Sequence, residues 1–522
     1  MIMKGKKVLA RIVAGIMALS FVFVTGCNDK NTNANLTSSD VASNTASTDS
    51  TNTESVPGEE QVVSVESGKA LPSGVYLGSD GKYYKQVPGK TNSKTSSKKG
   101  GTTNTTSKKN NNGGGGGGGA VISKEYSTPS RKVDDSKKGS ILVWGNANDV
   151  AMTAAVADYK KAYPNVQVTY TAPTGLSPTT LKAAIVAGNA PDVVRLDHVY
   201  AASMGAEGNL VDLTTLGASK VKSKFTQSCW EANMVGSKVY GLPFDANTIC
   251  FMYNKKILSK AGKSVPTNFT QLKDVAKAVK ASSPAVTPYS IPTEAPDNGQ
   301  KNWAAFNFFF WLWRNGGEIL NSSLTQATFN QQPGIDAMTQ LKELYKDGLA
   351  GSQYKQDFNG GKLAMWDMGS WVFEGTIWKD PDTFAVAPMI TLKSGVKNYS
   401  GLGLYSYCIP TSSKNKALAY DFTEFLCTDP NYQLTYCKGT ELIPSLPLAQ
   451  KNSYYTTGSK AAYWKVYIDQ LAASKARPGV QSWMDVERAV SSALDVAVKG
   501  QREVKVALDS AAATVNNRIK KK

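Results

Sequence analysis

Histidine and cysteine are scarce in this chain. Its 522 residues include one histidine, His198, and six cysteines. The cysteines lack the spacing of metal ligands, and a zinc site needs more His and Cys side chains than the chain can supply. We therefore expect no metal ion and no cofactor. The sequence also lacks a phosphate-binding loop, a zinc-protease motif and the Gly-x-Ser-x-Gly elbow of serine hydrolases.

Acidic residues are fewer than basic ones. The chain has 59 Lys and Arg against 41 Asp and Glu, a formal net charge of +18, which would ordinarily suggest a nucleic-acid partner. Much of the excess, however, lies in lysine pairs between residues 98 and 138 and in the terminal lysines 520–522. No basic stripe interleaved with aromatic residues occurs elsewhere. We expect no nucleic-acid partner, because this distribution suits an anionic membrane or wall surface.

Hydrophobic runs are short. Residues 12–24 form an apolar run behind a cluster of basic residues, and this run is too short for a permanent membrane span but typical of a signal peptide. Gly26 and Cys27 follow it. The pattern resembles the lipobox of bacterial lipoproteins, and the resemblance implies removal of residues 1–26 and a lipid on Cys27 at the outer face of the cytoplasmic membrane. The alternative is a plain signal peptide with an incidental cysteine.

Large apolar residues are rare in residues 27–138. Asn, Ser, Thr, Gly and Lys dominate there, including seven consecutive glycines at 113–119. Such a segment buries too little apolar surface to offset its ordering entropy. We predict a flexible stalk with a root-mean-square span on the order of 50–60 Å. Residues 75–84 alternate in polarity around Asp80-Gly81, which indicates either a hairpin or plain linker.

Residues 139–522 have the composition of a globular domain that is large enough for two lobes. Strand and helix patterns alternate at its start: a strand at 141–145, a helix at 149–163, a strand at 166–170, a helix from Ser177-Pro178 to Gly188 and a strand at 192–196. This alternation predicts a parallel sheet with helices on its faces. Because ligands bind where such strands end, Asn146 and Asp197 are placed at a crevice.

Three later segments predict helices. The aromatic run at 306–313 is too short to span a membrane and ends at Arg314 and two glycines, so we predict a buried helix. Residues 461–471 and 484–515 have helical apolar spacing and should pack on the same lobe.

Five motifs follow one another in a familiar order: Ile141-Leu142-Val143-Trp144; Asn189-Ala190-Pro191-Asp192; Gly241-Leu242-Pro243-Phe244-Asp245 leading into Met252-Tyr253-Asn254; Gly361-Lys362-Leu363-Ala364-Met365 leading to Gly369-Ser370-Trp371; and Tyr407-Cys408-Ile409-Pro410. In this order they resemble the sugar-binding, extracellular solute-binding proteins of ATP-binding-cassette importers, the group that includes maltose-binding protein. The resemblance implies an α/β, type II periplasmic-binding-protein-like fold whose two lobes, 139–248 with 388–445 and 249–387 with 446–522, flank a cleft crossed by hinge strands. It also implies a monomer that delivers its solute to membrane permease subunits.

A sugar site needs aromatic platforms for C–H faces and planar polar groups for hydroxyls. By the resemblance, Trp371 stacks on sugar and Trp483 supplies another platform, whereas the alternative for both is a place in the core. Asp245 and Asn247 precede the crossing strand 248–253, where side chains face the solute or hold the hinge.

Five other residues are weaker ligand candidates. Asp197 contacts ligand or caps the helix from Val199, and Asn146 contacts ligand or makes a turn. Glu294 and Trp303 flank a loop that, by the resemblance, supplies a polar group and an aromatic group to the site. Arg477 donates paired hydrogen bonds to sugar hydroxyls or pairs with a surface carboxylate.

Carbohydrate capture, of an oligosaccharide above all, is the function that we expect. A non-sugar solute and a co-receptor of a sensor kinase remain alternatives on the same fold. A glycosidase would need two carboxylates about a cleft, and Asp197 with Asp245 would have to supply them, but no spacing identifies such a pair. We therefore expect a binding protein and not an enzyme.

Overall fold

The computed structural model describes residues 122–128, 131–293 and 303–519, together with three short strands that precede residue 87. The chain separates into two compact units, Met1–Asn112 and Gly113–Lys522. The predicted signal peptide, Cys27 and most of the predicted stalk lie outside the described residues.

The first unit contains a small antiparallel sheet. Its strands are β1 (Glu60–Val63), β2 (Val75–Leu77) and β3 (Tyr83–Gln86), in the order β1-β3-β2. Tyr76 of β2 pairs with Tyr84 of β3, so the hairpin alternative for residues 75–84 is the one observed. The third strand, β1, was not predicted, and it adds the pairing that an isolated hairpin lacks.

The second unit begins with alternating strands and helices: β4 (Gly139–Trp144), α1 (Val150–Ala162), β5 (Val166–Thr171), α2 (Pro178–Ala187), β6 (Val193–Asp197) and α3 (His198–Ala206). Local chemistry sets these boundaries. Asp149 accepts a hydrogen bond from the Met152 amide at 2.9 Å at the start of α1, and Ser177 caps α2. Gly188 ends α2 in the left-handed conformation, with φ 73°. β4 pairs in parallel with β5 and β6, which confirms the predicted parallel sheet.

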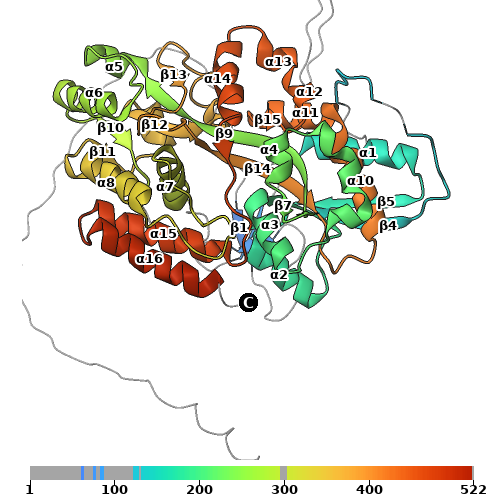
Figure 1. Cartoon of the computed structure of the whole chain (residues 1–522). Coiled ribbons are helices and arrows are strands. Elements are labelled where there is room, and N and C mark those ends of the chain that lie inside the picture. Colours follow the sequence, from blue (N-terminus) through green and yellow to red (C-terminus); the bar gives the residue numbers. More distant parts are fainter. Residues whose placement is uncertain are drawn as a thin grey trace, which may run out of the picture. The chain divides into compact units, whose positions relative to one another are not determined.

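Two long strands, β9 (Leu242–Asn254) and β14 (Ser400–Cys408), run across the centre of this unit (Figure 1). The first half of β9 pairs with β14, and its second half pairs with β12 (Leu363–Gly369) and β13 (Phe384–Ala387). The sheet order is β11-β10-β12-β9-β14-β6-β4-β5. A strand of 13 residues is about 44 Å long. β9 therefore belongs to both halves of the sheet, and the side chains at its middle lie where the halves meet.

Each half of the sheet has its own helices and core. α1 packs with α10 (Lys416–Thr428) and α11 (Pro430–Thr440) on the β4-β5-β6 half. On the other half, α7 (Trp303–Arg314), α8 (Gln332–Lys346), α15 (Trp483–Val498) and α16 (Val504–Ile519) pack together (Figure 1). Residues 304–314 of α7 are all buried, which confirms the prediction of a buried aromatic helix.

The other described helices and strands of this unit are short or peripheral. They are η1 (Leu213–Leu216), η2 (Ala218–Lys224), α4 (Gln227–Glu231), β7 (Met234–Val235), β8 (Lys238–Val239), α5 (Lys255–Lys260), α6 (Phe269–Ser282), β10 (Thr287–Ser290), β11 (Ala350–Gly351), α9 (Lys355–Asn359), η3 (Ser370–Val372), β15 (Ile443–Pro444), α12 (Pro447–Gln450), α13 (Ser453–Thr456), α14 (Ala461–Leu471) and β16 (Ser474–Lys475).

Residues 122–128 and 131–138 differ from the expectation that the stalk runs to residue 138. They lie against α1, α10 and α11, and we call them the N-terminal strap. Arg131 donates to both carboxylate oxygens of Asp421 at 2.7 Å, and the Tyr126 amide donates to Asn431 at 2.9 Å. Lys438 donates to Glu125 at 2.6 Å. The stalk prediction rested on the mostly polar composition of residues 27–138 taken together. That composition gives no sign of the few residues that form specific contacts with the domain.

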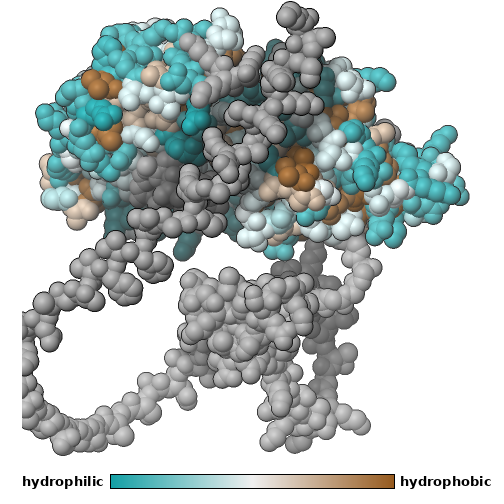
Figure 2. All heavy atoms as spheres, turned by 90° about the horizontal axis from the view of Figure 1, so that it is seen from below, coloured by the Kyte–Doolittle hydropathy of each residue, from teal (hydrophilic) through white to brown (hydrophobic). Residues whose placement is uncertain are grey.

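The five cysteines of the second unit are buried free thiols, and no disulfide forms among the described residues. In the part of the chain that the structure describes, no helix is both long and apolar enough to cross a membrane. On the face seen in Figure 2, the coloured surface is mostly hydrophilic, and hydrophobic residues occur in small scattered patches.

Candidate functional site

Two tryptophans lie side by side where the halves of the sheet meet. Trp371 follows β12 and Trp303 begins α7, and their ring centroids are 5.8 Å apart with an interplanar angle of 36°. Both are partly buried, and Trp371 packs against the cores of both halves. A glycine at position 369, the last residue of β12, is required for this arrangement, because a Cβ there would lie 1.7 Å from the Trp371 ring. The structure thus brings two of the predicted ligand residues together.

The register of the sheet places three more predicted residues on one face. Tyr405 of β14 pairs with Asp197 of β6 on one side and with Asp245 of β9 on the other. Gly403 pairs with Asn247. Because paired residues and alternate residues along a strand share a face, Asp197, Asp245 and Asn247 all project beside Tyr405.

Asp245 is fully buried and forms an ion pair with Arg195. Burial raises the pKa of the Asp245 carboxyl, and Arg195 opposes that shift. The guanidinium of Arg195 in turn lies over two rings, 4.0 Å from the centroid of Tyr405 and 5.1 Å from that of Tyr436. Asp245 therefore holds Arg195 at the crossing strands and presents no surface of its own to a solute.

Asp197 and Arg477 link the two halves of the sheet. Arg477 donates to both oxygens of Asp197 at 2.8 and 2.9 Å and to Glu487 of α15 at 3.0 Å. Asp197 also accepts from the Val199 amide at 3.1 Å, as the capping alternative predicted. Burial would raise the pKa of Asp197, but Arg477 and His198 hold it well below its ordinary value. Arg477 thus pairs with two carboxylates, and it does so in the interior, since only 7% of its surface is exposed.

The two asparagines have different surroundings. Asn146 is exposed beyond the end of β4, and its amide donates to the Tyr436 hydroxyl at 2.6 Å. Asn247 lies over Gly403, where a Cβ would come within 1.9 Å of its Oδ1 atom. Gly403 therefore provides the space that the Asn247 side chain occupies.

Trp483 contributes no surface to a ligand site. Trp483 is fully buried at the start of α15, with its ring centroid 5.7 Å from that of Phe309. This position matches the core alternative, because α15 packs its apolar side on α7. Glu294 lies outside the described residues.

Sequence reasoning missed Arg195, Tyr405 and Tyr436. Arg195 stands in the middle of an apolar strand, Asp192-Val193-Val194-Arg195-Leu196, and a buried charge there signals a partner. Tyr405 and Tyr436 carry no such signal, because neither lies at a motif end.

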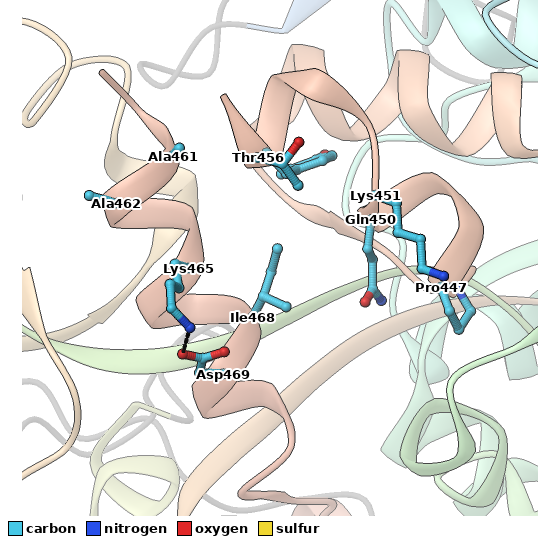
Figure 3. Close-up of a pocket in the computed structure, with 10 residues that line it drawn as sticks. Pro447, Gln450, Lys451, Thr456, Ala461, Ala462, Lys465, Ile468 and Asp469 are labelled. Carbon is cyan, nitrogen blue, oxygen red and sulfur yellow. Dashed lines mark hydrogen bonds and ion pairs between the residues drawn. The ribbon is translucent and has the colours of Figure 1, made fainter. Parts of the chain in front are cut away.

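A cavity of about 540 Å³ lies elsewhere, between α12, α13 and α14. Pro447 and Gln450 lie on one side of it, and α14, with Ala461, Ala462 and Ile468, lies on the other (Figure 3). None of the predicted ligand residues lines it. Among the described residues, no group of three His, Cys, Asp or Glu side chains could hold a metal ion.

Comparisons with known proteins agree with this architecture. The family model described as bacterial extracellular solute-binding protein matches residues 154–463, more than half of the chain. A galactooligosaccharide-binding protein of Bacillus subtilis (strain 168) is 24% identical over 404 residues, which cover 75% of this chain and 93% of that protein. A maltooligosaccharide ABC transporter solute-binding lipoprotein of Streptococcus pneumoniae (strain ATCC BAA-255 / R6) is 24% identical over 354 residues, which cover 64% and 78%.

Solved structures share the fold. The cyclic alpha-maltosyl-1,6-maltose binding protein from Arthrobacter globiformis superimposes with a TM-score of 0.65 at 23% identity, over 74% of this chain and all of that one. An ABC substrate-binding protein from Listeria monocytogenes in complex with cycloalternan gives 0.62 at 20% identity, over 73% and 99%. The crossing strands, the two cores and the family match lead to one conclusion: the chain belongs to the bacterial extracellular solute-binding proteins and has their type II, two-lobed α/β fold.

Proposed function

We propose that this protein captures an oligosaccharide outside the cytoplasm and delivers it to the permease subunits of an ATP-binding-cassette importer. The observation that carries the proposal is the pairing of Trp371 and Trp303 on two segments, η3 and α7, that contact β9 and β14. Two relatives, a galactooligosaccharide-binding protein and a maltooligosaccharide-binding lipoprotein, support the same class of ligand.

The chemistry of this region suits a sugar. A pyranose ring offers apolar C–H faces, which gain from contact with flat aromatic rings, and hydroxyls, which need planar donors and acceptors. Trp303 and Trp371 offer the rings. The exposed Asn146 and the partly exposed Asp197 offer an amide and a carboxylate.

Binding without catalysis fits the carboxylates. In a glycosidase, one carboxyl group must give a proton to the leaving oxygen while the other stays ionised. Asp197 is engaged by Arg477 and His198, and Asp245 is enclosed with Arg195. Neither is therefore free to act on a glycosidic bond.

We also propose lobe boundaries, an oligomeric state and a mode of membrane attachment. We assign residues 139–248 with 388–445 to lobe 1 and 249–387 with 446–522 to lobe 2, because the two cores divide near the middle of β9. We further propose that the domain works as a monomer on a stalk whose Cys27 carries lipid at the outer face of the membrane. Scattered rather than broad apolar patches on the face in Figure 2 support the monomer.

A thermal-shift screen tests the ligand class. Maltotriose, maltotetraose and a galactotriose are compared with a non-carbohydrate set of amino acids and polyamines. A ligand at 100 times its dissociation constant should stabilise the folded state by about 2.7 kcal/mol. If the melting temperature rises with no carbohydrate, the proposed ligand class is wrong; if product analysis finds cleaved sugar, the protein is an enzyme.

A further inference from the structure

Tyr405 is an unusual residue in a central strand. β14 is paired on both sides, by β6 and β9, and its eight other residues are buried. The Tyr405 side chain nevertheless keeps 37% of its surface exposed. A large ring at the centre of a sheet is exposed only where no helix or loop covers that part of the face, so the face of β14 is open at Tyr405.

The helices on either side define this opening. Two residues further along the same face, Tyr407 is fully buried against Phe244 in the lobe 1 core. In the other direction along the same face, Gly401 is covered by Phe306 of α7, since a Cβ there would lie 2.5 Å from that ring. Tyr405 therefore lies between the helices of lobe 1 and the start of α7, the helix that begins at Trp303.

The inner side of the Tyr405 ring is held by charge. The Arg195 guanidinium lies 4.0 Å from its centroid, and Arg195 is fixed by the buried Asp245. A cation over an aromatic face is attracted by the ring quadrupole, more strongly when both are withdrawn from water. A register shift between β14 and β9 lies directly beside Tyr405, and such bulges redirect side chains. The ring is thus fixed in place and is not a mobile surface tyrosine.

Hydrogen-bonding side chains share the face of the sheet with Tyr405. Asp197 is directly opposite Tyr405 on β6, and Asn247 of β9 is opposite Gly403, two residues from Tyr405. An aromatic face between a carboxylate and an amide has the composition that a sugar ring requires.

We infer that Tyr405 is a stacking platform for a sugar ring on the lobe 1 wall, backed by Arg195 and Asp245. This inference rests on the proposed function and adds to it a subsite that lies in lobe 1 alone. Arg195, Asp245, Tyr405 and Tyr436 all belong to lobe 1, so the platform exists before lobe 2 approaches. Trp371 and Trp303 then come from lobe 2, and a ligand of two or more sugar rings contacts both walls.

The test compares variants of Tyr405 in the full mature chain. The probe is the oligosaccharide of the panel above that most raises the melting temperature of the unaltered protein, and its affinity is measured by isothermal titration calorimetry. Tyr405→Ala should weaken binding at least tenfold, and Tyr405→Phe, which keeps the ring, should bind at least fivefold more tightly than Tyr405→Ala. Tyr345→Ala, which removes a partly buried ring on α8 away from this region, should not change affinity.

The outcomes separate the inference from the proposed function. If no carbohydrate binds the unaltered protein, the proposed function fails. If a carbohydrate binds and Tyr405→Ala binds it equally well, the platform is wrong. Should Tyr405→Ala fold poorly, Tyr405→Leu replaces it, and equal affinity of the Leu and Phe variants would overturn the need for an aromatic face.

Discussion

At the scale of single residues, two glycines and one arginine shape the proposed site. Gly369 leaves room for the Trp371 ring and Gly403 leaves room for Asn247. Neither glycine has a positive φ, so their role is close approach and not backbone freedom. Arg477 differs from both, because its two carboxylate partners make it a structural link between the lobes.

Trp371→Ala is expected to weaken oligosaccharide binding by about 1–2 kcal/mol, since it removes a stacking face from the lobe 2 wall. Gly369→Ala keeps the ring but forces it to move, and it should weaken binding in the same direction. Calorimetric affinity and melting temperature are measured on both variants. A core tryptophan would behave differently, because its truncation costs about 3–5 kcal/mol of folding free energy; preserved affinity with that loss would remove Trp371 from the site.

Arg477→Ala is expected to lower the free energy of unfolding by about 3–5 kcal/mol, because it leaves the buried Glu487 and the partly exposed Asp197 without the Arg477 guanidinium. Denaturant unfolding measures this. Arg488→Ala on the same helix breaks an exposed pair with Asp485 and should change little. Unchanged stability with lost sugar binding would show instead that Arg477 is a ligand donor.

At the scale of elements, the N-terminal strap changes where the stalk joins the domain. Asp421 of α10 accepts hydrogen bonds from Arg131, Lys137 and the Tyr159 hydroxyl. Although burial would raise the pKa of Asp421, the bonds from Tyr159 and Arg131 lower it below its ordinary 3.8. The strap is therefore held against lobe 1 by these contacts.

Asp421→Asn should lower the melting temperature at pH 7, because Arg131 and Lys137 lose their carboxylate. A depressed folded pKa contributes stability above the ordinary pKa, and this contribution is lost as pH falls through the folded value. The difference between Asp421→Asn and the unaltered protein should therefore be full above about pH 5 and vanish well below pH 3.8. Melting curves from pH 2 to 8 measure it, with the exposed Asp469→Asn as control. A difference that is independent of pH would contradict the ion-pair account.

At the scale of the whole molecule, the crossing of β9 and β14 is where ligand binding would change the angle between the lobes. β9 pairs with β14 in one half of the sheet and with β12 and β13 in the other, so a change of angle between the lobes would bend β9 near its middle. A ligand that contacts both walls favours the approach of the lobes only by its additional contacts in that state.

Small-angle scattering should show a smaller radius of gyration when saturating oligosaccharide is added, because the closed state gains contacts to both Tyr405 and Trp371. The same measurement on Trp371→Ala should show a smaller change at equal saturation. An unchanged radius in the unaltered protein would place the site within one lobe.

Cys27→Ser should release the protein from the membrane fraction and leave its melting temperature unchanged, because Cys27 precedes the domain by more than 90 residues. Cell fractionation and mass spectrometry of the mature N-terminus measure this. An unmodified N-terminus at another residue would argue for a plain signal peptide.

The sequence was most informative where structure depends on neighbouring residues. Caps at Asp149 and Ser177, the glycine stop at 188 and the buried aromatic helix follow from local propensity and periodicity, and all were predictable. The site was predictable only in part. Trp371 and Trp303 were both ligand candidates, and the structure brings them together. The interior position of Trp483, in contrast, depends on α7 and α15, which approach each other from distant parts of the chain.

The amino-acid sequence by itself determined the alternating α/β architecture, the family and the presence of aromatic and polar residues at motif ends, because periodicity, caps and motif order are properties of the linear chain. Only the tertiary structure decided which of those residues face one another. Strand register placed Tyr405 between Asp197 and Asp245, and packing withdrew Trp483 into the core while leaving Trp371 only partly buried. Packing also placed residues 122–128 and 131–138, which were predicted as stalk, against the domain as a strap. The physical reason is the same in each case: burial and ion pairing depend on what other segments bring to a position, and that is set by the fold as a whole.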